Sequence, residues 1–460
     1  MTDLAVHTTD IPGLLIVDLP VHGDNRGWFK ENWQRAKMTG LGLPDFGPVQ
    51  QNVSFNDEVG VTRGIHAEPW DKFVSVATGR IFGAWVDLRE GESHGRVVTL
   101  EMGPEKAVFV PRGVGNAYQT LEPGTAYAYL VNDHWSPQAK ERYTFVQLGD
   151  PVLGIDWPIP LDRAMLSDAD KAHPVLAESR PARTRRTVIL GAGGQLGRAL
   201  QAAMPDALAL TRAEADLATP ETLDAIEWRD VDAIVNAAAY TAVDLAETPE
   251  GRREAWATNV TGVAHLVDIA RRHRLPLVHV SSDYVFDGTA EEHTEDEPFS
   301  PLGVYGQTKA AGDALVATWE QHYLVRTSWV VGEGKNFVAT MAMLADKGVS
   351  PSVVDDQYGR LTFTQDLAAA IVHLLSSDAP YGTYNVTNSG PVQSWADIAA
   401  DVFELRGRSR EDITRVTTEE YGAGKDMAPR PVHSALDLGK ITAAGLSVPD
   451  AAVRLRSMLT

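Results

Sequence analysis

The stretch TVILGAGGQLGRAL, residues 187–200, decides the fold of the second half of the chain. It opens as a short apolar strand, passes through a glycine-rich turn and continues as the start of a helix. Glycines in such a turn let the backbone approach a pyrophosphate, whose charge is stabilised at the helix N-terminus. The sequence therefore predicts a dinucleotide-binding turn, formed by Gly191, Gly194, Gln195, Leu196 and Gly197.

The next predicted strand, residues 207–210, ends in Thr211 and Arg212 and not in a carboxylate. A carboxylate here would bind a ribose 2′-hydroxyl, whereas an arginine suits a 2′-phosphate. We therefore expect NADPH as the cofactor, with NADH as the alternative if Arg212 is simply solvated. Asp216 and Leu217 are expected to flank the adenine.

A further strand lies in the segment AIVNAAAYTAVD, residues 233–244. It ends in the small residues Ala237, Ala238 and Ala239, which would let a cofactor lie close to the backbone. Strands and helical stretches continue to alternate after this segment. This alternation predicts a doubly wound parallel sheet, the Rossmann type of α/β fold.

Two neighbouring stretches carry candidate catalytic residues: HVSSDYVFDG, residues 279–288, and PLGVYGQTKAAG, residues 301–312. In a helix, Tyr305 and Lys309 share one face, and the lysine ammonium would lower the pKa of the phenol. Ser282, at the end of the preceding strand, can donate a hydrogen bond to the same substrate oxygen. These groups suit proton transfer to a carbonyl oxygen while hydride reaches its carbon. Tyr-x-x-x-Lys also occurs on ordinary surface helices, so the upstream glycine turn is what favours a site.

The composition limits the possible functions. A chain of 460 residues has room for two or three domains with substantial cores. Its net charge of −21 argues against nucleic acid and anionic membranes as partners. The chain has no cysteine, no signal-peptide pattern and no apolar run of the ~18 residues that a membrane helix needs. We expect a soluble cytoplasmic protein.

The first half, residues 11–150, differs in pattern from the second. Short strand-like runs such as KFVSVATGRIFGAWVDLR, residues 72–89, alternate with glycine, proline or acidic turns, and no long amphipathic helix intervenes. This pattern predicts an all-β sandwich or barrel whose mouth holds a small ligand.

Charged and aromatic residues also cluster in the first half where a plain barrel does not need them. They occur in order along the chain, as DNRGWFKE (24–31), Gln50, Asn52, RGIH (63–66), Lys72, Arg89, Tyr129, GIDWP (154–158) and LSDAD (166–170). This series resembles the dTDP-4-dehydrorhamnose 3,5-epimerase family over residues 11 to about 170. The resemblance implies a cupin-like jelly roll that forms a homodimer through this domain, and a dTDP-sugar as substrate.

The same resemblance implies roles for individual residues. His66, oriented by Asp170, would remove protons alpha to the C4 ketone of the sugar, and Tyr129 would return a proton to the opposite face. Lys72 would stabilise the enolate oxygen. The residues implied in substrate binding are Arg26, Phe29, Glu31, Gln50, Asn52 and Arg63.

Two positions depart from the family pattern. Asn116 stands where many members have a histidine, and Trp135 takes the place of an aromatic residue that often follows the catalytic tyrosine. The predicted base, its carboxylate and the acid are retained, so we expect an active epimerase.

The segment HPVLAESRPARTRRT, residues 173–187, contains two prolines, several arginines and little apolar content. It predicts an exposed linker rather than a nucleic-acid patch, given the acidic chain. We place the epimerase-like domain at residues 1–178, the linker at 179–186 and the dinucleotide-binding domain at 187–460.

The second half, residues 187–458, resembles dTDP-4-dehydrorhamnose reductases, which are extended short-chain dehydrogenases. The motifs that carry the resemblance are VNAAAYTAVDLAE, HVSSDYVFDG, PLGVYGQTKAAGD, VRTSWVVG, DDQYGR and RPVHSAL. The resemblance implies that Tyr305 donates a proton, that Lys309 lowers its pKa and holds the nicotinamide ribose, and that Ser282 positions the C4 carbonyl. Asp244, Trp329 and Arg430 would contact the substrate, with a small substrate lobe from about Gly382 onwards.

No metal site stands out in the sequence by itself, although some relatives of this kind bind Mg²⁺ at a dimer interface. The two halves together predict consecutive epimerisation and NAD(P)H-dependent reduction of one sugar nucleotide, giving dTDP-L-rhamnose. The alternatives are reduction on the other face of C4, giving 6-deoxy-L-talose, or a half that serves only as a regulatory or nucleotide-binding module. The sequence leaves the nucleotide base, thymidine or uridine, and channelling of the intermediate open.

Overall fold

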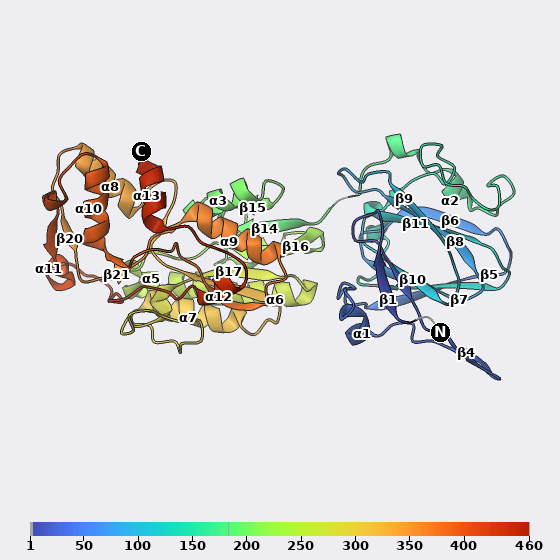
Figure 1. The fold of residues 1–460 in the computed structure, drawn as a ribbon, viewed down its shortest axis with the longest axis horizontal. Helices are drawn as coiled ribbons and strands as arrows, with labels where there is room; N and C mark the ends of the chain where they lie inside the picture. The colour runs from blue at the N-terminus through green and yellow to red at the C-terminus, as the bar shows by residue number, and fades with distance from the viewer. Residues whose placement is uncertain (1–2, 183, 460) are drawn as a thin grey trace. The chain divides into compact units, whose positions relative to one another are not determined.

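The computed structural model describes residues 3–182 and 184–459 and divides into two compact units, Met1–Thr184 and Arg185–Thr460. Figure 1 shows both units as ribbons. Among the described residues, no helix is both long enough and apolar enough to cross a membrane.

The first unit is built from two antiparallel sheets, which agrees with the predicted all-β class. The larger sheet has the order β1 (Ala5–Thr8), β2 (Leu15–Asp18), β10 (Lys106–Val110), β7 (Lys72–Thr78), β12 (Thr125–Val131), β5 (Gln50–Asn56). The smaller sheet has the order β13 (Thr144–Phe145), β6 (Thr62–Ala67), β11 (Val114–Thr120), β8 (Ile81–Asp87), β9 (Val97–Met102).

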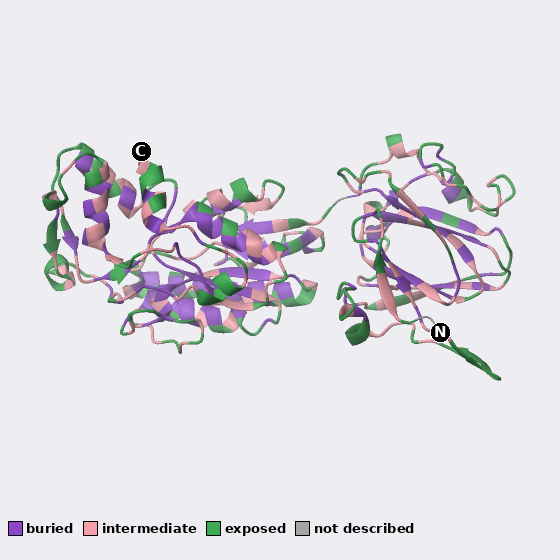
Figure 2. Ribbon diagram, viewed as in Figure 1, coloured by how far each residue is buried: buried purple, intermediate pink, exposed green. Residues whose placement is uncertain are grey.

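Apolar side chains of the two sheets form a common core. Val74 and Val108 of the larger sheet belong to the same buried cluster as Trp85, Val114 and Tyr118 of the smaller one. Figure 2 shows buried residues along the strands of both sheets. The alternation of strand residues thus directs one face of each sheet inward.

Short elements connect and flank the sheets of the first unit. The hairpin β3 (His22–Asp24) and β4 (Gly27–Phe29) is exposed along both strands and projects from the body of the unit (Figures 1 and 2). The helical elements are α1 (Arg35–Thr39), η1 (Gln138–Arg142), α2 (Asp168–Lys171) and η2 (Leu176–Glu178).

The second unit contains a six-stranded sheet in which every pair is parallel. Its order is β15 (Leu208–Leu210), β14 (Arg186–Leu190), β16 (Val231–Asn236), β17 (Leu277–Ser282), β18 (His322–Thr327), β23 (Gly382–Asn385). The first strand, β14, lies between the second and the third, so the winding direction reverses between β14 and β16. In open α/β sheets ligands bind at such a reversal, beyond the carboxyl ends of the strands.

Both faces of this sheet are covered by helices. Val188 and Leu190 of β14 pack into one core with helix α6 (Gly262–His273), whereas Ile189 packs into another with α3 (Gln195–Ala203) and α9 (Thr364–Ser376). Alternate residues of one strand therefore serve opposite faces, which explains why the strand is apolar throughout. The other helical elements along the sheet are α4 (Pro220–Asp224), η3 (Trp228–Asp230), η4 (Leu245–Glu247), α5 (Pro249–Trp256), η5 (Ala257–Thr261), η6 (Asp283–Val285), α7 (Val304–Val316) and α12 (Gly439–Ala443).

A separate core forms the small C-terminal lobe. The predicted amphipathic helix is confirmed as α10 (Trp395–Leu405), which buries Ile398, Val402 and Phe403 and begins with a capping box between Ser394 and Asp397. The other elements of this region are β19 (Val330–Val331), α8 (Phe337–Asp346), β20 (Ser352–Val354), β21 (Tyr358–Gly359), β22 (Thr362–Phe363), β24 (Gln393–Ser394), η7 (Arg410–Asp412), β25 (Thr414–Val416), α11 (Thr418–Gly422) and α13 (Ala451–Leu459).

The predicted linker, residues 179–186, lies around the division between the units. Ala182 is buried and forms a bridge with Arg89, so it belongs to the first unit, whereas Arg186 already begins β14. Ala182 and Arg186, on either side of the division, are therefore part of the folded structure of the first and the second unit, respectively. The boundaries of the linker stay a prediction.

Candidate functional site

In the first unit, the structure brings His66 and Asp170 together across 104 residues of sequence. His66 lies on β6, and its Nε2 is 2.8 Å from Oδ1 of Asp170 on α2. Burial opposes ionisation of Asp170, but hydrogen bonds and the charge of His66 outweigh it, so the pKa of Asp170 is lowered. An ionised carboxylate only accepts, so Nε2 carries the proton and Nδ1 of neutral His66 keeps the lone pair.

Lys72 and Tyr129 form a second group in the same unit. The Lys72 ammonium lies 5.4 Å from the centre of the Tyr129 ring and 2.7 Å from Oε2 of Glu68, and both charged side chains are at least 90% buried. Burial and the Glu68 charge raise the pKa of Tyr129 to about 12, so this phenol holds its proton at neutral pH. The structure thus shows a buried cation and a protonated phenol in contact.

Aromatic contacts join these two groups. The ring of His66 meets Phe145 at 5.3 Å, and Phe145 meets Tyr143 at 5.7 Å. Burial raises the pKa of Tyr143, and the neighbouring Glu68 and Tyr129 add to that rise. Tyr143 therefore lies between His66 and Tyr129 in one connected cluster.

The departure at Asn116 has a structural explanation. Its Oδ1 accepts hydrogen bonds from Nε1 of Trp85 and from the hydroxyl of Tyr127, both at 2.9 Å. Both donors belong to core residues that need a partner when buried. Asn116 thus provides the acceptor for two buried donors, next to His66, with which it pairs across neighbouring strands.

The predicted substrate-binding residues of the first half fall into two places. Gln50 and Asn52 lie on β5 and are joined by a hydrogen bond, and Arg63 lies on β6 with Nε 3.3 Å from Oδ1 of Asn56. Arg26 and Phe29 lie on the exposed hairpin, where Arg26 pairs with Asp24. Glu31 follows the hairpin and pairs with Lys37. No described contact joins Arg26, Phe29 or Glu31 to His66.

His173 is an unexpected neighbour of the His66–Asp170 pair. Its ring stacks on Phe145 at 4.7 Å and meets His66 at 5.3 Å, and its Nδ1 lies 4.0 Å from Oδ1 of Asp170. The ligand atoms of His66, Asp170 and His173 lie within 4.8 Å of one another, a donor set that can hold a metal ion. The sequence analysis missed this cluster because His173 falls in the predicted linker segment.

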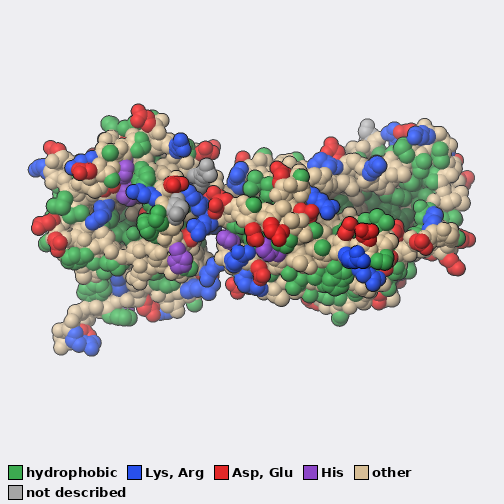
Figure 3. All heavy atoms as spheres, turned by 180° about the vertical axis from the view of Figure 1, so that it is seen from behind, with side chains coloured by type: hydrophobic (Ala, Val, Ile, Leu, Met, Phe, Trp, Pro, Cys, Tyr) green, Lys and Arg blue, Asp and Glu red, His purple; other side chains and the backbone are tan. Residues whose placement is uncertain are grey.

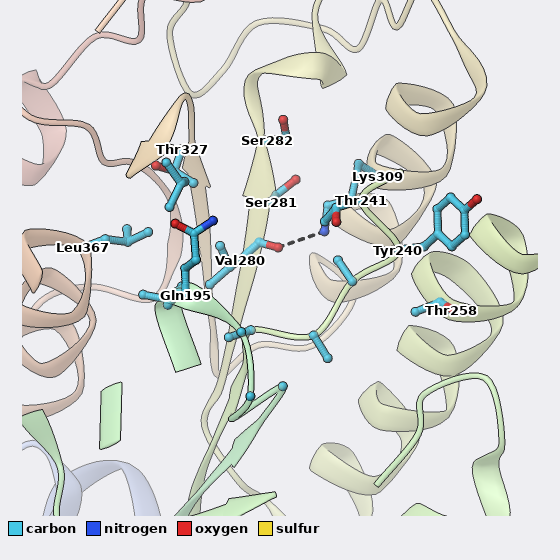
Figure 4. A pocket seen from close by; sticks show the side chains of 18 of the residues that line it. Gln195, Tyr240, Thr241, Thr258, Val280, Ser281, Ser282, Lys309, Thr327 and Leu367 are labelled. Atoms are coloured by element: carbon cyan, nitrogen blue, oxygen red, sulfur yellow. Dashed lines mark hydrogen bonds between the residues drawn. The ribbon is translucent and has the colours of Figure 1, made fainter. Parts of the chain in front are cut away.

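In the second unit, a cavity of about 780 Å³ opens at the carboxyl ends of the parallel strands. Most of the predicted cofactor residues line it, namely Gly191, Gly194, Gln195, Leu196, Arg212, Asp216, Leu217, Ala237, Ala238, Ala239, Tyr305 and Lys309. Ser282 and Trp329 line it as well, and Figure 4 shows Ser282 and Lys309 from neighbouring elements facing this space. Gly197 does not line the cavity.

Close backbone approaches explain the glycines of the turn. Gly191 has φ +81°, and a Cβ there would lie 2.7 Å from the backbone nitrogen of Ala238. A Cβ at Gly197 would lie 2.2 Å from the carbonyl oxygen of Gly191, so this glycine serves close packing of helix against turn. Gly194 caps α3 without a side-chain bond, which leaves backbone N–H groups at the helix start.

Tyr305 and Lys309 lie one turn apart on α7, as predicted, and both are buried. The Lys309 ammonium donates to the carbonyl oxygen of Val280 at 2.8 Å (Figure 4) and lies 3.3 Å from Nε2 of His279. Burial lowers the pKa of Lys309 to about 8, against the opposing charge of Asp313.

The predicted lowering of the Tyr305 pKa is not what the structure shows. Burial raises the pKa of Tyr305, the charge of Asp283 adds to the rise, and Ser282 only partly opposes it. The expectation overlooked desolvation, which disfavours a buried phenolate. Tyr305 therefore remains a protonated phenol at neutral pH, the form that a proton donor requires.

The predicted substrate residues of the second half lie beside these groups. Arg430 donates to both carboxylate oxygens of Asp244, at 2.9 and 3.0 Å, and opposes the raised pKa of Tyr284, which lines the cavity. Trp329 has φ +45° and stacks on Trp395 at 3.7 Å. The Trp329 ring is thus fixed between the cavity and the C-terminal lobe.

Comparison with known proteins assigns both units. The family described as RmlD substrate binding domain matches residues 185–460, more than half of the chain, and the family described as dTDP-4-dehydrorhamnose 3,5-epimerase matches residues 8–178. The chain belongs to both families. It is a fusion of an epimerase domain with a reductase domain.

Individual relatives support each domain separately. The epimerase domain is 52% identical over 177 residues to a protein named RmlC homolog from Streptococcus pyogenes, an alignment that covers 37% of this chain and 89% of that protein. The reductase domain is 37% identical over 278 residues to a dTDP-4-dehydrorhamnose reductase from Aggregatibacter actinomycetemcomitans, covering 56% of this chain and 92% of that protein.

A solved structure also matches the reductase domain. It is a dTDP-4-dehydrorhamnose reductase from Bacillus anthracis in complex with NADP, with a TM-score of 0.56 and 32% identity. The match covers 60% of this chain and 98% of that chain. Both enzyme classes predicted from the sequence are therefore represented in this chain.

The structure adds residues that the sequence analysis did not identify. In the epimerase domain they are Glu68, Tyr143 and His173, and in the reductase domain they are His279, Asp283 and Tyr284. Asp283 and Tyr284 stand inside a quoted motif, directly after Ser282, and their position at the strand end was an available signal. His279 opens the same motif. Glu68, Tyr143 and His173 depend on contacts that no sequence pattern indicated.

Proposed function

We propose that this chain converts dTDP-4-dehydro-6-deoxy-D-glucose into dTDP-L-rhamnose in two steps, epimerisation at C3 and C5 and then reduction of the C4 ketone. The proposal is supported by one observation above all. A single chain retains the His66–Asp170 pair in an epimerase domain and the Ser282, Tyr305 and Lys309 set around the cavity of a reductase domain. We further assign the first domain to the cupin-like jelly rolls and the second to the Rossmann type.

In the epimerase domain, His66 acts as the base through Nδ1, while Asp170 holds Nε2–H and stabilises the imidazolium that forms. Lys72 stabilises the enolate oxygen that appears when the proton leaves carbon. Glu68 is the buried counter-ion of Lys72, at 2.7 Å. Tyr129, protonated because of its raised pKa, returns a proton to the opposite face.

The exposed hairpin suggests how the epimerase site is completed. Arg26 and Phe29 lie on this hairpin, and Phe29 is 65% exposed. Val53 and Phe55 are exposed on β5, an edge strand of the larger sheet. Figure 3 shows the hairpin protruding, with basic and acidic side chains side by side at its tip. We assign these features to a homodimer in which the hairpin of one protomer reaches the substrate of the other.

Mixing two inactive variants tests this arrangement. Subunits with His66→Ala and subunits with Arg26→Ala/Phe29→Ala each lack one part of every site. In a mixed dimer, one site regains both parts, so random pairing should restore roughly a quarter of wild-type epimerase activity. Absence of any recovery after subunit exchange contradicts the shared site.

The reductase cavity fits a dinucleotide cofactor. Gly191 and Gly194 leave room for a pyrophosphate at the start of α3, and Ala237 to Ala239 form the facing wall. NADPH supplies the hydride when bound there. Arg212 is 79% exposed and pairs with Asp216 at 3.2 Å, so it can turn to a 2′-phosphate at small cost. The NADP complex of the Bacillus anthracis relative also favours NADPH, with NADH as a secondary cofactor.

The side chains of the reductase domain then handle the proton. Tyr305 donates its proton to the C4 oxygen as the carbonyl carbon is reduced, and Ser282 holds the same oxygen. Lys309 holds the nicotinamide ribose and compensates the phenolate that remains on Tyr305. Asp244, Arg430 and Trp329 orient the sugar and thereby decide which face of C4 is presented.

The decisive experiment is NADPH oxidation with dTDP-4-dehydro-6-deoxy-D-glucose and no added epimerase, followed by identification of the product sugar. We expect dTDP-L-rhamnose, and we expect His66→Ala or Tyr305→Phe to abolish its formation. Oxidation that starts only when a separate epimerase is added would limit activity to the second domain. A 6-deoxy-L-talose product would instead show reduction on the other face.

A further inference from the structure

The hydroxyl of Ser282 is engaged in hydrogen bonds with its own neighbours in the chain. Ser282 Oγ donates to Oδ1 of Asp283 at 2.9 Å and accepts a hydrogen bond from the backbone N–H of Tyr284 at 3.2 Å. A serine hydroxyl has only one proton to donate. In this arrangement Ser282 cannot donate to a ketone in the cavity, although its role in the proposed reduction requires that donation.

The carboxyl group of Asp283 is poorly satisfied as an anion. Asp283 is 3% exposed, and its Oδ2 is buried with no hydrogen-bond partner among the residues that the structure describes. Ser282 is a hydrogen-bond donor to Oδ1, but a buried carboxylate with one oxygen unpartnered is still disfavoured relative to its protonated form. Asp283 therefore holds its proton to higher pH than an exposed carboxyl group does.

Groups from several elements surround this carboxyl group. Tyr284 follows it on η6, Tyr305 lies on α7, and His293 and Ser434 also lie close enough to affect its pKa. The ion pair of Arg430 with Asp244 lies close enough to affect the pKa of Tyr284, and the charge of Asp313 affects that of Tyr305. Burial raises the pKa of Asp283 to about 6, against the opposing effects of Ser434, Ser282 and His293.

We propose that Asp283 is a positioning residue that controls the direction of the Ser282 proton. When protonated, Asp283 donates to Ser282 Oγ, and the serine proton turns towards the substrate carbonyl. When ionised, Asp283 accepts that proton and withdraws it from the substrate. The proton on Asp283 is not transferred to the substrate. Its presence or absence only sets whether Asp283 is the donor or the acceptor in the hydrogen bond with Ser282. This inference rests on the proposed reductase function.

The pH dependence of the reductase step tests the inference. The ketone is equilibrated beforehand with a separate 3,5-epimerase, so that His66 does not enter, and NADPH is saturating. Wild-type kcat is expected to fall between pH 5.5 and 7.5 towards the value of Ser282→Ala. Asp283→Asn and Ser282→Ala should both lack this fall, and the double variant should match Ser282→Ala. Glu291→Gln, an exposed carboxylate nearby, should keep the wild-type profile.

Two further results separate the possible failures. No NADPH oxidation by the wild type at any pH would refute the proposed function itself. An unchanged fall of kcat in Asp283→Asn or in Ser282→Ala would overturn the role of Asp283. If Asp283→Asn does not fold, the pH profile of Ser282→Ala decides: loss of the fall in kcat supports the role of Asp283, and an unchanged fall overturns it.

A measurement without turnover completes the test. Because the folded-state pKa of Asp283 is raised to about 6, its contribution to stability is full below the unfolded pKa of about 3.9, is lost as pH rises from there to about 6, and is constant above that. The Tm of the reductase domain in the wild type, compared with Asp283→Asn, should therefore drop over this range. A difference in Tm that is constant with pH would show that Asp283 does not titrate there, and the inference would fail.

Discussion

Lys72 and Lys309, the two lysines proposed to act in the sites, are both buried, but different groups contact them. Lys72 in the epimerase domain pairs with the carboxylate of Glu68 at 2.7 Å. Lys309 in the reductase domain donates to a backbone carbonyl, and its pKa falls to about 8 through burial. A carboxylate carries the full negative charge that offsets a buried ammonium, whereas a backbone carbonyl carries only a dipole.

Replacement of Glu68 by Gln should therefore be costly. It leaves Lys72 as a buried charge without its counter-ion, and breaking such a pair costs about 3–5 kcal/mol. We expect denaturant unfolding of the epimerase domain to report a loss of this size, together with a large drop in epimerase kcat. Glu58→Gln, at an exposed position, is the matched control and should change neither quantity. Wild-type stability in Glu68→Gln would refute the structural role of the pair.

Asp170 makes the stability of the epimerase domain depend on pH in the acid range. Its folded-state pKa is lowered, burial being outweighed by hydrogen bonds, so its contribution is present above the unfolded value of about 3.9 and is lost as pH falls through the folded value. The unfolding free energy of the wild type minus that of Asp170→Asn should be constant above about pH 5 and shrink below about pH 4. Asp168→Asn, in the same helix but fully exposed, should show no such trend.

At the scale of elements, the glycine turn and α3 pack so closely that some of their glycines leave no room for a side chain. A Cβ at Gly197 would meet the backbone of Gly191 and Ala192, whereas a Cβ at Gly193 meets nothing within 4 Å. The same substitution to alanine is therefore expected to act very differently at these two sites.

Gly197→Ala should separate α3 from the turn and weaken NADPH binding by tenfold or more, about 1.4 kcal/mol. Gly193→Ala should leave the Kd for NADPH within about twofold, because the added methyl group meets open space. Titration by nucleotide fluorescence measures both values. Equal losses in the two variants would show that the close approach of helix to turn has no part in binding.

At the scale of the whole molecule, each domain has its own cores and its own site. Buried clusters of the epimerase domain draw only on residues before 184, and those of the reductase domain only on residues after 185. Domains with separate cores unfold as separate cooperative units.

We therefore expect two unfolding transitions in calorimetry. Saturating NADPH should raise the Tm of the reductase domain alone, by the equivalent of about 2.7 kcal/mol at one hundred times its Kd. Glu68→Gln should lower the Tm of the epimerase domain alone. A single transition that both changes shift equally would contradict independent domains.

The comparison of sequence with structure shows how far local patterns reach. The apolar strand, the glycine turn and the Tyr305–Lys309 spacing are local features. They predicted a strand, a helix start and a shared helix face, which the structure has as β14, α3 and α7. The all-β class of the first half follows from its short, regularly punctuated strands. The contacts of the exposed hairpin with Arg26 and Phe29 could not be predicted in this way, since no local pattern states what a projecting loop will meet.

The sequence by itself determined two domains, their classes, the elements that carry the sites and most of the residues around the cofactor cavity. Only the tertiary structure decided the charge states, as in the raised pKa of Tyr305, and the contacts of Lys72 with Glu68 and of Asp283 with Ser282. Periodicity and turn chemistry are properties of neighbours along the chain, and a sequence displays them directly. Desolvation and ion pairing depend on which distant groups the fold places around a side chain, and these are fixed only when the chain has folded.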